Sequence, residues 1–189
     1  MSDGELNLAY LALGSNSQAE RYLPAAVVEL SQHGRIVAVS KVWQNPPVDG
    51  GDQPDYLNAA ILLETDLSAV DLCLEIIPAI EAKLDRVRDP NNKYAMRTID
   101  IDIVLFNNDI LQIEHRRIPD PEIESRPFLA IPLAQLNPDY MHPGTGQTLA
   151  TIAQSADVSC LRLRSDVDLQ AALPKQTNVW RKRQMRTHP

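Results

Sequence analysis

The spacing of hydrophobic residues changes several times along this chain, and each change marks a predicted element of secondary structure. Four stretches are continuously apolar or alternate between apolar and polar residues, which is typical of β-strands. They are residues 7–13, 35–44, 56–65 and 97–106. Two further stretches carry apolar residues at helical spacing. They are residues 20–33, which Gly34 follows as a predicted helix end, and residues 69–87.

The second predicted helix carries clear local signals. Ser68 and Asp71 form the sequence pattern of a capping box, which predicts that the helix begins after Ser68. Pro78 lies inside the helix, and we expect it to kink or shorten the helix because proline has no backbone N–H to donate.

Turn signals separate the predicted elements. The first strand ends at Gly14-Ser15-Asn16. Residues 45–55 are rich in proline, glycine and aspartate, and residues 86–96 are mostly polar, so both are expected to be loops. Residues 107–109 form a tight turn into residues 110–113, which predicts a hairpin with the strand before it.

The order of these elements is strand, helix, strand, strand, helix, strand, which is the βαββαβ pattern of a ferredoxin-like fold. We therefore expect an α+β protein in which helices pack on one face of a mainly antiparallel sheet. Up to about residue 155 the chain adds a further strand, loops and one or two short helices. Beyond that point the pattern weakens and the end is basic. The prediction is a domain of residues 1–155 and a partly irregular C-terminal extension of residues 156–189.

Composition and charge exclude several classes of protein. The 189 residues carry a formal net charge of −7, which argues against nucleic acid as a partner because contact with the phosphate backbone needs a basic face. Cys73 and Cys160 lack metal-type spacing and make no disulfide framework, which favours a reducing cytoplasm. The N-terminus lacks the features of a signal peptide. No apolar run approaches the roughly 20 residues of a membrane span, so no membrane partner is expected.

One predicted strand carries an unusual pair of acids. Asp100 and Asp102 lie on the same face of strand 97–106, roughly 6–7 Å apart by strand geometry. At an effective dielectric constant of about 20, two such carboxylates repel each other by roughly 2–3 kcal/mol. Carboxylates at this spacing suit Mg²⁺, which completes its shell with water and phosphate oxygens. The alternative is a solvent-facing part of an ordinary strand, and spacing alone does not decide between them.

Basic residues gather near this pair, although the whole chain is acidic. They are Arg86, Arg88, Lys93, Arg97, Arg116, Arg117 and Arg126. Cations together with metal-binding carboxylates are what polyphosphate transfer needs. The alternative is surface charge paired with neighbouring acids. The sequence contains neither a Walker-type loop nor a G-x-G-x-x-G motif, so neither of these loops holds the phosphates.

A second group of residues suits a flat ring. Two prolines stiffen the loop beside Asn45 and Val48, and Tyr56 and Asn58 share one face of the next strand. An aromatic ring with an amide offers stacking and a donor–acceptor pair, which favours a heterocyclic ligand. The alternative is a core tyrosine and an asparagine that forms a strand-end hydrogen bond.

These motifs, in this order, resemble a known enzyme family. The matching segments are ALGSN (12–16), NPPV (45–48), QPDYLNAA (53–60), IE…RVR (80–88), RTIDIDIVLF (97–106) and IP…SRPF (118–128). Together they are similar to 6-hydroxymethyl-7,8-dihydropterin pyrophosphokinase, the ATP-dependent enzyme of folate biosynthesis. The resemblance spans roughly residues 7–155.

The resemblance implies roles for individual residues. The two aspartates of the family motif hold two Mg²⁺ ions between ATP and the pterin hydroxyl, and here they are Asp100 and Asp102. The implied catalytic residues are Arg86, Arg97, Asp100 and Asp102. The implied ATP contacts are Glu81, Arg88, Lys93, Tyr94, Ile103, Asp120 and Arg126. The implied pterin contacts are Asn45, Pro46, Val48, Tyr56, Asn58 and Phe128, with Tyr56 and Phe128 on the two faces of the ring.

The reaction that the resemblance implies moves a pyrophosphoryl group from ATP to the hydroxymethyl oxygen of the pterin and leaves AMP. Positioning and electrostatics supply most of such catalysis, so no covalent nucleophile is expected. The partners are then two small molecules, pterin and ATP. A monomer suffices for this chemistry, and a dimer is the alternative.

Three positions depart from the family pattern. Asp120 stands where a histidine usually contacts the ATP phosphates, and an aspartate there repels phosphate. Asp85 replaces the glycine of a common G-R-x-R segment, and Asn45 stands where threonine is common. The departures at Asp120 and Asp85 favour an alternative, a family member that binds pterin or nucleotide without efficient transfer. An RNA-binding ferredoxin-like module is a third alternative, which the few aromatic residues and the acidic charge disfavour.

Overall fold

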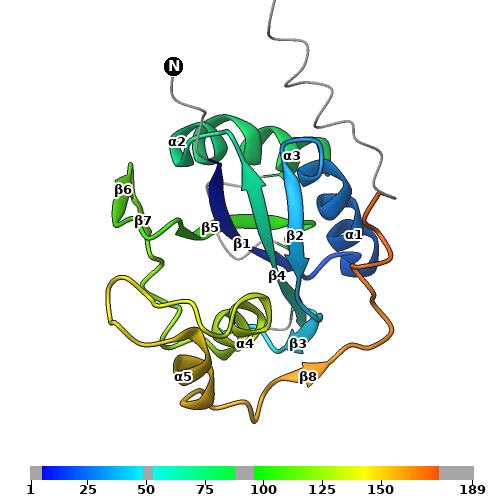
Figure 1. Cartoon of the computed structure of the whole chain (residues 1–189). Helices are drawn as coiled ribbons and strands as arrows, with labels where there is room; N and C mark the ends of the chain where they lie inside the picture. The colour runs from blue at the N-terminus through cyan, green and yellow to red at the C-terminus, as the bar shows by residue number, and fades with distance from the viewer. Residues whose placement is uncertain (1–5, 49–52, 88–95, 175–189) are drawn as a thin grey trace, which may run out of the picture.

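The computed structural model describes residues 6–48, 53–87 and 96–174. In these residues six strands form one antiparallel sheet in the order β5-β1-β4-β3-β8, with β2 also paired to β4 (Figure 1). The strands are β1 (Asn7–Ser15), β2 (Arg35–Val39), β3 (Trp43–Asn45), β4 (Tyr56–Thr65), β5 (Asp100–Phe106) and β8 (Arg162–Leu163). The order of the first four predicted strands is that of a ferredoxin-like sheet, so the α+β prediction is confirmed.

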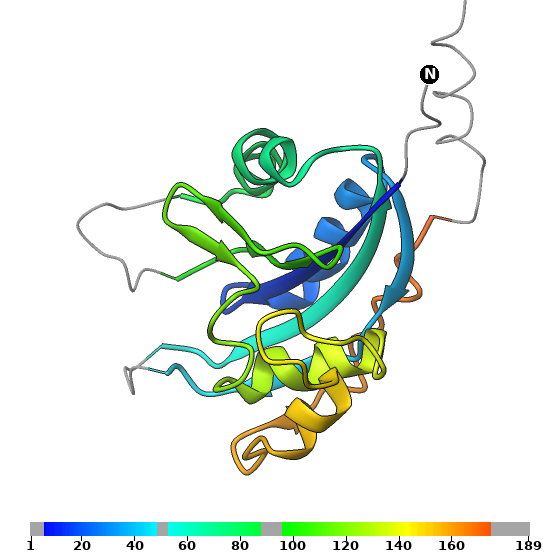
Figure 2. The ribbon, with the colours of Figure 1, turned by 60° about the vertical axis from the view of Figure 1, so that its left-hand side comes forward.

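The two helices of the predicted βαββαβ pattern pack on one face of this sheet as expected, and two later helices, for which no face was predicted, cover the other face. Helices α1 (Ala19–Leu30) and α3 (Ile77–Lys83) pack on one face, in a core that includes Leu11, Leu23 and Ile80. Helices α4 (Pro127–Leu136) and α5 (Leu149–Gln154) pack on the other face, in a second core around Tyr10, Leu62 and Leu133 (Figure 2). The second core exists because β1 and β4 are apolar on both faces.

The predicted strand 35–44 is divided in two. Ser40 interrupts it, since its hydroxyl accepts a hydrogen bond from the Ala60 N–H at 2.8 Å and donates to the Lys41 carbonyl at 2.8 Å. A side chain thus takes over a hydrogen bond that regular pairing would give to the backbone. The chain resumes pairing with β4 at Trp43, so that β3 presents Asn45 at the end of the sheet.

The predicted helix 69–87 begins with the capping box of Ser68 and Asp71, which is confirmed. It runs as α2 (Ala69–Asp71), a π-helical turn η1 (Leu72–Ile76) and α3, and ends at Lys83 rather than Val87. Pro78 lies in the first turn of α3. Because proline donates no N–H and crowds the preceding turn, the helix widens just before it instead of kinking apart.

Gly34 follows α1 as predicted, but for a different reason. Its backbone is not in the left-handed region that ends many helices. A Cβ atom at this position would lie 2.3 Å from the carbonyl oxygen of Glu64, so glycine is required where the chain passes close to β4.

Two details of the region after residue 100 differ from the sequence prediction. The register between β1 and β5 shifts at Tyr10 and Leu11, so Val104 and Leu105 both pack in the second core and Phe106 packs in the first. The predicted hairpin also forms elsewhere, because β6 (Leu111–Ile113) pairs with β7 (Arg116–Ile118) and not with β5. The turn at Asn107, with φ of 46°, directs the chain away from the sheet.

The chain after residue 155 returns to the sheet. Strand β8 pairs with β3, Leu169 is buried in the first core, and Val167, Ala172 and Leu173 pack against that core. The basic end, residues 175–189, lies outside the described residues. Among the residues that are described, no helix has the length and apolar character needed to cross a bilayer.

Candidate active site

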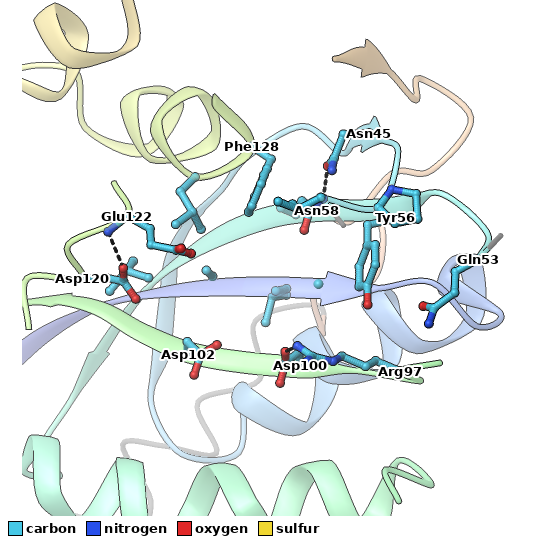
Figure 3. Close-up of a pocket in the computed structure, with 18 residues that line it drawn as sticks. Asn45, Gln53, Tyr56, Asn58, Arg97, Asp100, Asp102, Asp120, Glu122 and Phe128 are labelled. Atoms are coloured by element: carbon cyan, nitrogen blue, oxygen red, sulfur yellow. Dashed lines mark hydrogen bonds and ion pairs between the residues drawn. The ribbon is translucent and has the colours of Figure 1, made fainter. Parts of the chain in front are cut away.

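One cavity of about 610 Å³ collects most of the predicted site residues (Figure 3). It lies over the ends of β1, β4 and β5, and the first turn of α4 forms one of its walls. The predicted residues that line it are Asn45, Val48, Tyr56, Asn58, Arg97, Asp100, Asp102, Asp120 and Phe128. They come from segments as far apart as residues 45 and 128. The sheet thus brings the residues predicted to bind a flat ring and those predicted to bind phosphates into a single site.

Asp100 is held by two arginines at the polar end of the cavity. Nη1 of Arg97 forms an ion pair with Oδ2 of Asp100, and Nη2 of Arg86 lies 3.1 Å from Oδ1. The side chain of Arg86 is only 11% exposed, and its Nε and Nη1 atoms are buried without a hydrogen-bond partner in the described residues. A buried guanidinium with unused N–H groups is suited to an anionic ligand. Burial alone would lower the pKa of Arg97, but the charge of Asp100, its bond to Arg97 and the charges of Tyr56 and Asp102 together outweigh burial and raise this pKa.

Asp102 has weaker compensation for its charge. Half of its side-chain surface is exposed to the cavity, and the rest is surrounded by protein. The nearest cation in the described residues is Arg116, whose Nε lies 4.0 Å from Oδ1 of Asp102. Burial, and then the charges of Asp100 and Glu81, raise the pKa of Asp102 to about 6, although Arg116 opposes the shift. Arg116 was part of the basic group in the sequence but was not among the predicted site residues.

The Gly-Ser-Asn turn at the end of β1 fixes the backbone of Arg97. Oδ1 of Asn16 accepts from the Arg97 N–H at 2.7 Å, and the Arg97 carbonyl accepts from the Asn16 N–H at 3.0 Å. Nδ2 of Asn16 also donates to Oε1 of Gln53 at 2.9 Å, on the loop before Tyr56. Sequence reasoning found this motif but assigned it no role. Its role is to connect the backbone of Arg97 to the loop that leads into Tyr56.

Three residues that were predicted to contact ATP do not line the cavity. Glu81 is buried, and its Oε1 accepts from the Ile101 N–H at 3.0 Å, so it supports the strand that carries the aspartates. Ile103 packs on the opposite face of β5, in the first core. Arg126 stands just before α4 and bonds to Oε1 of Glu122 at 3.0 Å. Arg88, Lys93 and Tyr94 lie outside the described residues. All six contacts stay predictions.

The other end of the cavity has a flat, half-polar lining. Phe128 from α4 and Tyr56 from β4 lie on either side of Asn58 (Figure 3). Nδ2 of Asn58 donates to Oδ1 of Asn45 at 2.6 Å, and Nδ2 of Asn45 donates to the Pro46 carbonyl at 2.8 Å. These bonds orient both amides. Pro47, and not the predicted Pro46, lines the cavity.

Comparison with known proteins gives the chain a family. Residues 10–138 match the sequence profile of 7,8-dihydro-6-hydroxymethylpterin-pyrophosphokinase (HPPK). The chain belongs to the HPPK family. It is 35% identical over 158 residues to 2-amino-4-hydroxy-6-hydroxymethyldihydropteridine pyrophosphokinase of Haemophilus influenzae, a match that covers 82% of this chain and 97% of that protein. It is 38% identical over 133 residues to the Bacillus subtilis protein of the same name, covering 69% and 78%.

Solved structures show the same fold. Wild-type Plasmodium falciparum HPPK-DHPS superimposes with a TM-score of 0.63 at 15% identity, over 82% of this chain and 45% of that longer chain. This chain therefore corresponds to less than half of the Plasmodium protein. At that identity the likeness supports the HPPK fold alone.

Asp120, which departs from the HPPK pattern, lines the cavity on the same side as Asp102 (Figure 3). Its Oδ1 accepts from the Glu122 N–H at 2.7 Å, and its own N–H donates to the Val104 carbonyl at 2.9 Å. Burial raises the pKa of Asp120, and the charge of Glu122 adds to the shift, whereas the Glu122 N–H opposes it. The side chain therefore adds a further acid to the wall that already holds Asp102.

Asp85, the second departure expected from the sequence, adopts a backbone conformation that glycine favours. Its φ is 62°, in the left-handed region that aspartate tolerates better than most residues. Oδ2 of Asp85 accepts from the Tyr22 hydroxyl at 2.8 Å, and Nη2 of Arg21 lies 3.9 Å away. The hydrogen bond to α1 offsets the backbone strain at the residue before Arg86, which does not itself line the cavity but is paired with Asp100.

We expect Asp85→Ala to lower the free energy of unfolding by about 1–2 kcal/mol, because alanine keeps the strained φ and loses the bond to Tyr22. Asp85→Gly should cost less, since glycine removes the strain. Thermal unfolding of both variants, with Tyr22→Phe as the control for the lost hydrogen bond alone, measures the two contributions. Equal stability of Asp85→Ala and the starting protein would contradict this account.

Proposed function

We propose that this chain transfers a pyrophosphoryl group from ATP to 6-hydroxymethyl-7,8-dihydropterin, giving AMP and the pterin diphosphate used in folate synthesis. The observation that carries the proposal is one cavity that is lined both by Tyr56, Phe128 and two oriented amides and by two aspartates, of which Asp100 is paired with Arg86 and Arg97. The relatives that bear the name of this enzyme support it.

The pterin occupies the flat end of the cavity in this proposal. Tyr56 and Phe128 cover the two faces of the ring, and the oriented amides of Asn45 and Asn58 meet the donors and acceptors along its edge. Val48 adds apolar contact at the mouth. The hydroxymethyl group then points towards β5, where Asp100 and Asp102 stand.

ATP occupies the polar end, with Arg86 and Arg97 at its phosphates. The residues present fit a divalent cation, since Asp100 and Asp102 offer hard oxygen ligands on one face of β5. Burial, and then the charges of Asp100 and Glu81, raise the pKa of Asp102, and a cation beside it would favour the ionised form. We propose that these two carboxylates hold Mg²⁺, with two ions as in the family. When bound, Mg²⁺ supplies charge neutralisation to the phosphates. Arg97 orients them, and the fixed backbone of Arg97 keeps that orientation before substrate arrives.

We propose a monomeric enzyme with two small-molecule substrates, pterin and ATP. We propose that it acts in the cytoplasm. The alternative of a family member that binds without transfer is not favoured, because Arg97, Asp100 and Asp102 remain together in the cavity and the compared relatives are named as pyrophosphokinases.

The decisive experiment is to incubate the purified protein with ATP, Mg²⁺ and 6-hydroxymethyl-7,8-dihydropterin and to separate the nucleotides. AMP in equal amount to the pterin diphosphate is the expected result. ADP would indicate transfer of a single phosphoryl group. Binding of both substrates with no AMP would instead support the non-transferring alternative.

Asp120→His is expected to tighten ATP binding about threefold to tenfold, because it removes a carboxylate from the wall that faces the phosphates. Calorimetric titration with ATP and Mg²⁺ measures the change. Asp120→Asn is the matched control, since it removes the charge and keeps an acceptor for the Glu122 N–H. If neither variant binds ATP more tightly than the starting protein, Asp120 does not weaken nucleotide binding.

A further inference from the structure

The chain beyond the HPPK match comes back to the pterin end of the site. The match ends at residue 138, whereas β8 (Arg162–Leu163) pairs with β3, with Leu163 opposite Trp43 and Arg162 opposite Gln44. The Arg164 N–H continues this pairing by donating to the Val42 carbonyl at 2.9 Å. Leu169, five residues further on, is buried in the first core and anchors the segment. Strand β3 is thereby paired on both of its sides (Figure 1).

The side chain of Arg164 joins three parts of the fold. Its Nε and Nη2 atoms bind the carboxylate of Asp166 at 2.9 and 2.7 Å, which fixes the plane of the guanidinium. Nη2 also donates to Oε1 of Glu20, at the start of α1, at 2.9 Å. Nη1 donates to Oε1 of Gln44 on β3 at 3.2 Å. Only 24% of the Arg164 side chain is exposed, so these bonds are partly shielded from water.

Gln44 passes this restraint on to both strands of the pterin pocket. Its Nε2 donates to Oδ2 of Asp55 at 2.7 Å. Gln44 immediately precedes Asn45, and Asp55 immediately precedes Tyr56; Asn45 and Tyr56 are paired across β3 and β4. Side chains alternate along a strand, so Gln44 lies on the face of β3 opposite the cavity that Asn45 lines. Arg164 therefore restrains the pocket residues from the face of the sheet opposite the cavity.

We propose that Arg164 is a positioning residue for the pterin, acting through Gln44 and Asp55 to hold Asn45 and Tyr56 in the geometry that binds the ring. The inference rests on the proposed function and adds a residue that lies outside the HPPK match. Strand β3 has only three residues, so its pairing with β4 alone restrains Asn45 weakly. The hydrogen bonds from Arg164 to Gln44 and from Gln44 to Asp55 connect this short strand to the residue just before β4. Binding is tighter when the pocket is ordered in advance.

The test is the affinity for 6-hydroxymethyl-7,8-dihydropterin of Arg164→Ala, measured by calorimetric titration. The titration contains Mg²⁺ and an ATP analogue in which a methylene group replaces the oxygen between the α and β phosphates. Release of AMP requires the bond between that oxygen and the β phosphorus to break, so the analogue binds without reacting. We expect Kd for the pterin to rise about threefold to tenfold. KM for the pterin should rise equally, while KM for ATP and kcat stay within about twofold.

Arg162→Ala is the matched control, because it also removes a cation from β8. In the described residues the Arg162 side chain forms no hydrogen bond or ion pair with Gln44 or Asp55, so the substitution should leave both constants unchanged. Arg164→Lys keeps the charge but not the three-way geometry and should give an intermediate Kd. Gln44→Ala should raise Kd as Arg164→Ala does, and the double variant should add little to either. Circular dichroism and the thermal midpoint report whether each variant is folded.

Three outcomes would overturn the inference. The first is an unchanged Kd for the pterin in folded Arg164→Ala. The second is an equal rise in the Kd for the pterin and the Kd for ATP. The third is a rise in the Kd for the pterin in Arg162→Ala as large as that in Arg164→Ala. A variant that loses only kcat or thermal stability has a structural defect, which also speaks against positioning. Because the titration needs no turnover, failure of the starting protein to release AMP would reject the proposed function separately. If the starting protein binds no pterin, both proposals fall.

Discussion

Asp102→Asn is expected to lower the rate of AMP release by at least about a thousandfold and, at the same time, to stabilise the protein in the absence of metal. The loss of activity follows from removal of one of the two carboxylates proposed to hold Mg²⁺. The gain in stability follows from the raised pKa of Asp102, about 6, because folding forces a charge into a poorly compensated site. Since the side chain is half exposed, we expect a gain of only about 1 kcal/mol, or roughly 2–4 °C in the thermal midpoint.

The sign of the pH dependence makes this result specific. The folded-state pKa of Asp102 lies above its ordinary value of 3.8, so the folded protein holds the proton more tightly than the unfolded chain. The stability gain from asparagine is therefore full above about pH 6 and disappears as the pH falls towards about 4. Thermal unfolding at several pH values, in a chelating buffer, checks this. A gain that is independent of pH would contradict the assignment.

Asp100→Asn is the informative comparison. We expect an equal loss of AMP release but the opposite effect on stability, because Arg86 and Arg97 would lose their common partner. The expected cost is about 2 kcal/mol, since the Arg86 side chain is nearly buried. If both substitutions changed the thermal midpoint in the same direction, the two aspartates would not differ electrostatically as described.

Glu81→Ala is expected to lower the free energy of unfolding by about 2–3 kcal/mol, or roughly 4–10 °C in the thermal midpoint. The reason is that Glu81 is buried and accepts from the Ile101 N–H, which alanine would leave without this partner inside the protein. The Ile101 N–H lies between the two aspartates on β5, so the loss should also reduce AMP release. Thermal unfolding and the AMP assay measure the two effects.

Glu81→Gln separates support of the strand from contact with the nucleotide. Glutamine retains an oxygen for the Ile101 N–H, so most of the stability should return. It also removes a charge that raises the pKa of Asp102. If Glu81→Ala is as stable as the starting protein but has a raised KM for ATP, the result would instead favour the direct ATP contact that the family resemblance implies.

Local signals in the sequence predicted much of the fold. Strand β4 and the capping box at Ser68 were found where predicted, because alternation and capping depend on residues a few positions apart. Alternation also predicted that Asp100 and Asp102 share a face, and both line the cavity. The register shift opposite Tyr10 was not predictable in this way, since it depends on how β5 meets β1.

The contacts that complete the site were invisible to pattern analysis because they join distant residues. Asn16 bonds to Arg97 over 81 positions, and Arg164 bonds to Gln44 over 120 positions. Neither pair contributes to any local period. The turn at 14–16 was predicted from its residue types, but nothing in the sequence indicated what its asparagine holds. Asp85 was identified as a departure, yet its compensation by Tyr22 needed the structure.

Strand β5 is the last strand of the sheet order, and this position has a consequence for self-association. The outermost strand of a sheet presents unpaired backbone groups that can recruit a strand from another molecule, and charged side chains along it oppose such pairing. On β5 the Ile101 N–H is already bonded to Glu81 and the Val104 carbonyl to the Asp120 N–H, and the charges of Asp100 and Asp102 oppose pairing along the rest of the edge. Asp102→Asn should therefore aggregate faster than the starting protein at high concentration even though it unfolds at a higher temperature, so solubility and thermal stability are expected to move in opposite directions.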